Sequence, residues 1–67
     1  MEHVLAKTLL ITDVVNMIAK KYHIKIDEAR DAFYNSKIID LLDDDETGLY
    51  GESALYIFSL YEKYNEK

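Results

Sequence analysis

An acidic run next to a glycine is the first group of residues in this sequence that could do chemistry, because clustered carboxylates bind calcium. In the twelve-position pattern of a calcium-binding loop, Asp43, Asp45 and Thr47 fall at positions one, three and five. Gly48 then falls at position six, which the pattern requires to be glycine. Position twelve is Ala54, where the pattern requires a bidentate glutamate. The sequence therefore favours a solvated loop, and we expect no metal ion and no cofactor.

His23 and Asp27 form the second candidate, since a histidine followed by a carboxylate could act as a general base with its orienting partner. No serine or cysteine nucleophile lies near them in the sequence. We therefore interpret His23 as a surface residue at a helix end. A helical chain of 67 residues also has little room for a concave pocket of about 300 Å³ or more. We predict no catalytic residues and no enzymatic activity.

The loop after the acidic run is the third candidate, and its chemistry would be recognition of another protein. It contains the only two glycines of the chain, which favour a tight turn because glycine enters the left-handed backbone region freely. Tyrosine supplies a large contact area and is enriched at the centres of interfaces. The predicted partner-binding residues are Thr47, Leu49, Tyr50 and Tyr56. The alternative is that the tyrosines line the rim of a small core.

A small basic cluster provides an alternative function, a helix-turn-helix-like regulator that binds DNA. The predicted nucleic-acid contacts are Lys20, Lys21, Lys25 and Arg30. A recognition helix normally begins with basic and amide residues, but this one would begin with Asp27 and Glu28. Residues 40–67 add eight acidic residues against two lysines, and the net charge of the chain is −5. Binding to nucleic acid is therefore not the preferred interpretation.

Hydrophobic periodicity predicts an all-α fold, a small three- to four-helix bundle. Apolar residues recur at intervals of three, four and seven over Val4–Tyr22, which is typical of a long amphipathic helix. Asp27 is expected to cap a second helix that reaches Phe33. Asn35 and Ser36 should then break the middle region into a pair of helices, with asparagine in a left-handed end position and serine as the next cap.

The remaining elements are a short third helix and a C-terminal helix that packs back on the first. The third helix should run through Ile38 and Leu42, and the last should start at Glu52 or Ser53 and reach about Tyr64. The first and last helices are apolar over more than one face. One face would form the core, and another could meet a second copy or a partner.

Length and composition limit the number of domains, the sources of stability and the localisation. Residues 1–67 form a single domain with a marginal core, because chains of this size bury a small share of their surface. The chain has no cysteine, so disulfides cannot add stability, and self-association or a protein partner is the expected compensation. Neither a signal peptide nor an apolar stretch of about 20 residues is apparent, so we expect a cytoplasmic protein without a membrane association.

Two segments carry a resemblance to known proteins. These are Phe33-Tyr34-Asn35-Ser36 and Glu46-Thr47-Gly48-Leu49-Tyr50, followed by Glu52-Ser53 and Tyr56. On these residues, nearly the whole chain resembles a family of short bacterial helical proteins of unknown function. The resemblance implies an accessory or antitoxin-like role in a regulatory or toxin–antitoxin-like system, and it assigns no catalytic residue. We therefore expect a non-enzymatic protein–protein interaction module, a homodimer or a protein that binds another protein.

Overall fold

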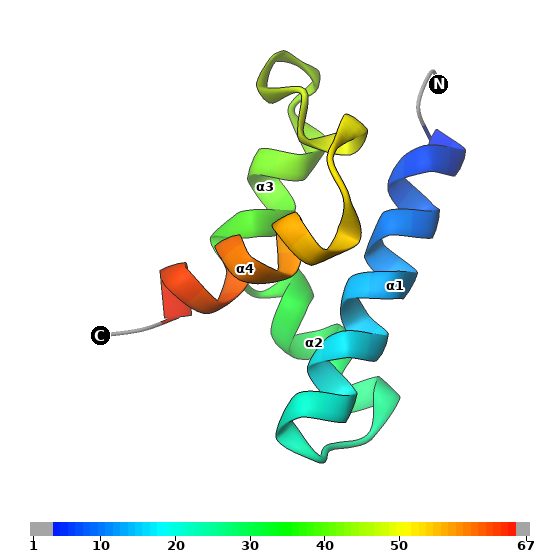
Figure 1. Ribbon diagram of the computed structural model, residues 1–67, viewed down its shortest axis with the longest axis vertical. Coiled ribbons are helices and arrows are strands. Elements are labelled where there is room, and N and C mark those ends of the chain that lie inside the picture. Colours follow the sequence, from blue (N-terminus) through cyan, green and yellow to red (C-terminus); the bar gives the residue numbers. More distant parts are fainter. Residues whose placement is uncertain (1–3, 66–67) are drawn as a thin grey trace.

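Four α-helices make up the fold in the computed structural model, which describes residues 4–65. They are α1 (Val4–Tyr22), α2 (Ile26–Tyr34), α3 (Lys37–Asp43) and α4 (Ala54–Asn65), with single 3₁₀ turns η1 (Asp45–Thr47) and η2 (Leu49–Gly51) between α3 and α4. In Figure 1, α1 forms one side of the molecule, α2 and α3 follow each other through its middle, and the C-terminal end of α4 lies on the opposite side. The C-terminal helix α4 packs against α1 and α3. The predicted all-α fold, with a long first helix and the last helix packed on it, is confirmed.

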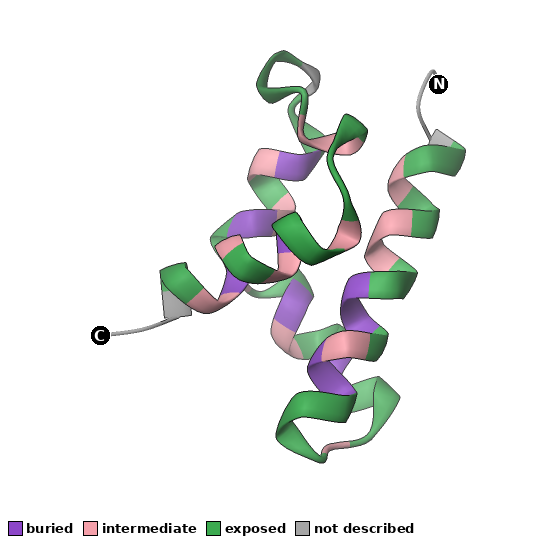
Figure 2. Ribbon diagram, viewed as in Figure 1, coloured by how far each residue is buried: buried purple, intermediate pink, exposed green. Residues whose placement is uncertain are grey.

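The core draws apolar side chains from all four helices, as the buried segments in Figure 2 show. Phe33 of α2 is completely buried, and its ring centroid lies 5.9 Å from that of Tyr61 on α4. The other buried residues are Val14, Val15, Ile18, Ala19, Ala29, Ile38, Leu42 and Ile57. On α1, the buried positions follow the three- and four-residue spacing of one helix face. The first helix is therefore amphipathic, as predicted, and its apolar face is turned toward the core.

The end of α1 uses a histidine where glycine is more common. His23 has a φ of 57°, in the left-handed region, and the N–H of Ile24 donates to the carbonyl oxygen of Ala19 at 3.1 Å. This hydrogen bond between residues five apart is typical of a Schellman motif, which satisfies a free carbonyl group at the C-terminus of a helix. A side chain with a Cβ atom is strained in this conformation. His23 therefore lies at a sharp reversal of the chain, as a surface residue at a helix end.

The start of α2 differs from the prediction. The helix begins at Ile26, one residue before the predicted cap Asp27, and Lys25 occupies the cap position. The N–H of Lys25 donates to Oε1 of Glu28 at 3.1 Å, so a carboxylate in the first turn returns to the cap backbone. Asp27 lies inside the first turn, where its negative charge complements the helix dipole. The prediction of Asp27 as the cap was wrong because Glu28 supplies the terminal hydrogen bond.

The break between α2 and α3 lies at the predicted Asn35 and Ser36, but both residues act differently from the prediction. Asn35 has a φ of −93°, outside the left-handed region, and its side-chain amide donates to the carbonyl oxygen of Asp31 at 2.9 Å. The Ser36 hydroxyl donates to the carbonyl oxygen of Phe33 at 2.6 Å and does not cap α3 through its side chain. Both side chains therefore close the end of α2 rather than open α3.

The start of α4 agrees with the prediction. The helix begins at Ala54, and Oγ of Ser53 accepts a hydrogen bond from the N–H of Tyr56 at 3.2 Å. This is the contact that an N-cap serine makes with the third residue of a helix. Ahead of it, Gly48 adopts a φ of 68°, so one of the two glycines makes the predicted left-handed turn. Gly51 does not have a positive φ.

Candidate interaction surface

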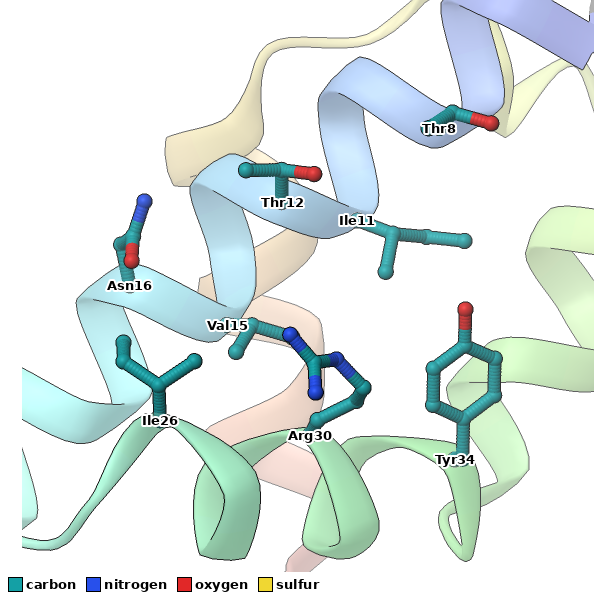
Figure 3. A pocket seen from close by; sticks show the side chains of 8 residues that line it. All are labelled: Thr8, Ile11, Thr12, Val15, Asn16, Ile26, Arg30 and Tyr34. Atoms are coloured by element: carbon teal, nitrogen blue, oxygen red, sulfur yellow. The ribbon is translucent and has the colours of Figure 1, made fainter.

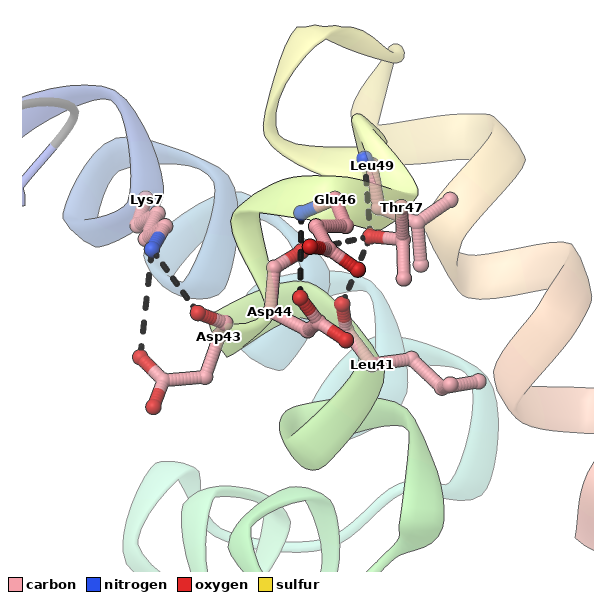
Figure 4. A network of polar contacts seen from close by, with 7 residues as sticks. All are labelled: Lys7, Leu41, Asp43, Asp44, Glu46, Thr47 and Leu49. Carbon is pink, nitrogen blue, oxygen red and sulfur yellow. Dashed lines mark hydrogen bonds and ion pairs between the residues drawn. The ribbon is translucent and has the colours of Figure 1, made fainter.

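Thr47, one of the predicted partner-binding residues, is the centre of a local hydrogen-bond network (Figure 4). Its hydroxyl oxygen lies 2.7 Å from the carbonyl oxygen of Leu41 and 2.8 Å from that of Asp44. The same oxygen accepts a hydrogen bond from the N–H of Leu49 at 3.2 Å. Thr47 therefore ties the end of α3 to the turn that follows, which is a structural use of its hydroxyl group.

The other three predicted partner-binding residues differ in exposure. Leu49 and Tyr50 are half-buried and pack against the core from η2. The Nζ atom of Lys7 lies 5.9 Å from the centroid of the Tyr50 ring, so this ring also contacts α1. Tyr56, in the first turn of α4, is 47% exposed. Of this predicted set, Tyr56 presents the most apolar surface to solvent, and the binding role of all four stays a prediction.

Two of the carboxylates in the acidic loop have partners, one within the loop and one on α1. The N–H of Glu46 donates to Oδ1 of Asp44 at 3.0 Å. Lys7 of α1 donates to the carbonyl oxygen of Asp43 at 3.1 Å, and its Nζ atom lies 3.9 Å from a carboxylate oxygen of the same residue. Among the described residues, no three histidine, cysteine or acidic side chains lie close enough to hold a metal ion. The loop is tied to α1 by Lys7, as Figure 4 shows.

The four predicted nucleic-acid contacts do not share one surface. Lys21 pairs with Glu62 of α4, whereas Lys20 and Lys25 line a hollow on another side of α1. Arg30 lies on α2, where its guanidinium is 3.4 Å from a carboxylate oxygen of Asp27. The basic residues are thus divided between two sides of the first helix. The hollow that Lys20 and Lys25 line shares Asn16 and Ile26 with the hollow that Arg30 lines, so only Lys21 is separated from the other three. The DNA-binding alternative stays a prediction.

Lys21, Tyr22 and Glu62 form a polar contact between α1 and α4. The carboxylate of Glu62 pairs with the ammonium of Lys21 and accepts a hydrogen bond from the Tyr22 hydroxyl at 3.2 Å. The bond from Lys21 lowers the pKa of Glu62 most, and the bond from Tyr22 lowers it further. The pKa of Tyr22 is raised, first by desolvation and then by its bond to the carboxylate. Both shifts favour the ionised glutamate and the neutral phenol that hold the two helices together.

A groove lies between α1 and the α2–α3 pair, on the side of α1 that faces α2. Two adjoining hollows of about 230 and 390 Å³ form it, and they share Thr8, Ile11 and Tyr34. Figure 3 shows Arg30 and Tyr34 reaching from α2 toward α1, with Ile11 and Val15 between the helices. The groove therefore has an apolar floor between two polar edges.

The edges of the groove carry groups that could orient a ligand. Thr8, Thr12 and Asn16 are exposed along α1 at four-residue intervals, so they lie in one row beside the floor. Arg30 supplies a positive charge on the α2 edge, between Ile26 and Tyr34 (Figure 3), and Asp40 and Asp43 supply negative charge beside Lys7 at the α3 end. No histidine or cysteine lines either hollow. The arrangement suits binding through apolar contact, with charged groups on the α2 edge and at the α3 end.

The sequence prediction did not include most of this groove. Arg30 was assigned to nucleic acid, and Thr8, Thr12 and Tyr34 were not assigned to any site. The signal that could have found the α1 edge is the row of polar residues at four-residue intervals directly beside Ile11 and Val15. The α2 edge could not be paired with it before the crossing of the two helices was known.

Comparisons with known proteins do not add a family to this picture. No protein-family model, curated protein or solved structure matches the chain. The resemblance to short bacterial helical proteins, and the antitoxin-like role that it implies, therefore stay predictions. Over residues 4–65, none of the helices combines the length and the apolar character needed to cross a membrane.

Proposed function

We propose that the protein is a non-enzymatic interaction module whose α1–α2 groove binds an amphipathic helix of a partner protein. The observation that carries this proposal is a groove in which the half-buried Ile11, with Val15 buried beneath it, lies between two polar edges. Helices commonly bind such grooves through apolar residues at positions i, i+4 and i+7. The accessory or antitoxin-like role is one setting in which a module of this kind would operate.

The dimensions of the groove fit a short helix. Its edge on α1 extends from Lys7 to Asn16, which is about 14 Å at 1.5 Å per helical residue. Anchors at positions i and i+7 of a bound helix are about 10 Å apart, so three anchors fit within this length. A small-molecule site would normally enclose most of its ligand in one cavity, whereas this groove consists of two adjoining hollows along α1.

Charge sets the expected chemistry of the partner helix. Arg30 contacts the exposed carboxylate of Asp27, and an exposed pair of this kind is weak, so the guanidinium is able to bind a partner carboxylate instead. Asp40 at the α3 end would attract a basic residue. We therefore expect a partner helix with an acidic residue beside its apolar stripe and a basic residue near one end of that stripe.

The substitution that tests this function is Thr8→Arg. Thr8 is exposed and lines both hollows, so an arginine there fills the middle of the groove without entering the core. Arginine is also a better helix former than threonine, so α1 should remain intact. The matched control is Ser59→Arg, which makes a similar change at an exposed position of α4 outside the groove.

The measurement is quantitative capture of proteins from the native cell lysate by the tagged wild type and both variants. We expect at least one protein that wild type and Ser59→Arg retain and that Thr8→Arg loses by about tenfold or more, because the inserted side chain blocks the anchor positions. Circular dichroism should show equal helicity for all three proteins. Equal capture by Thr8→Arg, or no specific capture by the wild type, would contradict the proposed function.

A further inference from the structure

We propose that a second copy of this chain binds to the outer face of α1 in antiparallel orientation. This face borders the groove, because Asn16 and Ile26 line both the groove and the apolar hollow of this face. The proposed dimer interface and the proposed partner-helix site therefore meet along this edge of α1. The observation behind the proposal is that the two halves of the face are complementary. Apolar side chains project from the N-terminal half, and an apolar hollow lies in the C-terminal half.

The projecting side chains are Leu5 and Leu9, which are 72% and 58% exposed. They lie four residues apart and point away from the buried side of α1 that carries Val14 and Ile18. Two leucines one turn apart on an outward helix face leave apolar surface in water that the fold itself does not cover. Such a pair is a suitable anchor for another protein surface.

The hollow lies on the same side of α1, two to three turns further along. It has a volume of about 610 Å³, and its apolar lining includes Met17, Ala19, Ile24 and Ile26. At 100° per residue, the rim residues Asn16 and Lys20 project within about 60° of Leu5 and Leu9. The projecting leucines and the hollow therefore share one face of one helix.

Reversal of a second copy brings these features together. Leu5, Thr12 and Ala19 are seven residues apart and therefore lie nearly in line along α1. The side chain is large at Leu5 and small at Ala19. In an antiparallel pair of α1 helices, Leu5 of each copy would enter the hollow of the other, above the largely buried Ala19 in its lining. The two Thr12 residues would meet near the twofold axis. The methylene groups of Lys20 would lie along the leucine while its ammonium remains in water. A twofold axis repeats each contact, so the interface closes as a dimer.

The available area is sufficient for a weak but specific dimer. A standard interface buries about 800 Å² per partner, which is about one sixth of the 4856 Å² accessible surface of this chain. The 19 residues of α1 extend about 28 Å, and α1 with the start of α2 is about 20 Å wide. A flat face of these dimensions covers about 560 Å², roughly two thirds of the standard area, so we expect a weak dimer with micromolar or lower affinity.

Engineered cysteines test both the dimer and its orientation, because the natural chain has none. We expect oxidised Thr12→Cys to form a disulfide-linked dimer, since this position lies near the axis. Leu5→Cys mixed with Lys20→Cys should cross-link, whereas Leu5→Cys alone should not, because the two copies run in opposite directions. Ser59→Cys, on the exposed side of α4, is the control that should stay monomeric under the same conditions.

Light scattering and sedimentation of the purified chain provide the equilibrium test. Leu9→Glu should weaken the dimer by about tenfold or more with unchanged helicity, and Leu55→Glu, at an exposed leucine of α4, should not. Leu9 lines neither hollow of the groove, so Leu9→Glu should leave capture of the groove's partner unchanged. Failure of the groove proposal would then not be mistaken for failure of this one. A monomer at all concentrations, or cross-linking of Leu5→Cys alone, would overturn the antiparallel dimer.

Discussion

His23 shows how much a single residue contributes to the path of this chain. It takes a left-handed backbone conformation that a Cβ atom makes unfavourable by about 1–2 kcal/mol. Glycine has no such strain, although it gains more backbone entropy on unfolding. We expect His23→Gly to raise the free energy of unfolding by about 0.5–1 kcal/mol and the melting temperature by a few degrees.

The matched control is His23→Ala, measured by thermal and urea unfolding beside the glycine variant. Alanine removes the imidazole but keeps the Cβ atom, so it should bring no gain in stability. Equal stability of the alanine and glycine variants would show that backbone strain at position 23 does not limit the stability of the fold.

Between α1 and α4, the contact of Lys21 and Tyr22 with Glu62 predicts a pH dependence. The pKa of Glu62 is lowered in the folded state. Its contribution to stability is therefore fully present above the ordinary glutamate pKa and is lost as the pH falls through the lowered folded-state pKa. We expect Glu62→Gln to melt below the wild type at neutral pH, and the difference should vanish in acid. The effect should be small, because Lys21 is exposed to solvent and Glu62 is only partly buried.

Glu52→Gln is the control for this pH series, since it removes the same charge from an exposed residue in the turn before α4. Melting curves over a range of pH should show a pH-dependent loss for position 62 and little change for position 52. A Glu62→Gln difference that persists unchanged in acid would mean that the carboxylate charge does not stabilise the contact.

The helices could be predicted from the sequence more accurately than some of their ends. The periodicity of α1 and the serine ahead of α4 gave bounds that agree with the structure, because both signals are local. The start of α2 was misplaced because Glu28, rather than Asp27, makes the terminal hydrogen bond. At the α2–α3 break, Ser36 had two backbone groups within reach, and its hydroxyl bonds the carbonyl of Phe33. The choice depends on backbone geometry that the sequence alone does not show.

The candidate site was harder to predict than the fold because it is made by two elements. Leu49 and Tyr50 looked exposed as loop residues, but η2 packs them against the core. Tyr34 looked like part of a motif, and the crossing of α1 and α2 places it on the edge of a groove. Sequence periodicity identifies the faces of one helix, whereas a groove depends on how two helices meet.

At the scale of the whole molecule, we expect the stability of the fold to depend on Phe33. It is fully buried and contacts the ring of Tyr61 from the last helix. Removal of a buried phenylalanine side chain costs about 3–5 kcal/mol, and a chain of this size is stable by only about 3–10 kcal/mol. We expect Phe33→Ala to be largely unfolded by circular dichroism, while Phe33→Leu keeps a cooperative transition. Native helicity and an unchanged melting temperature for Phe33→Ala would contradict the central place of this ring.

The central claim is that the groove between α1 and α2 binds the partner protein. The most direct measurement is an amide NMR spectrum of the labelled chain, recorded with and without the protein that wild type captures and Thr8→Arg loses. We expect the largest shifts at groove residues such as Thr8, Thr12 and Arg30, with smaller shifts on the outer side of α4. Shifts confined to Leu49, Tyr50 and Tyr56, with the groove unchanged, would contradict the claim and place the binding site on the loop before α4.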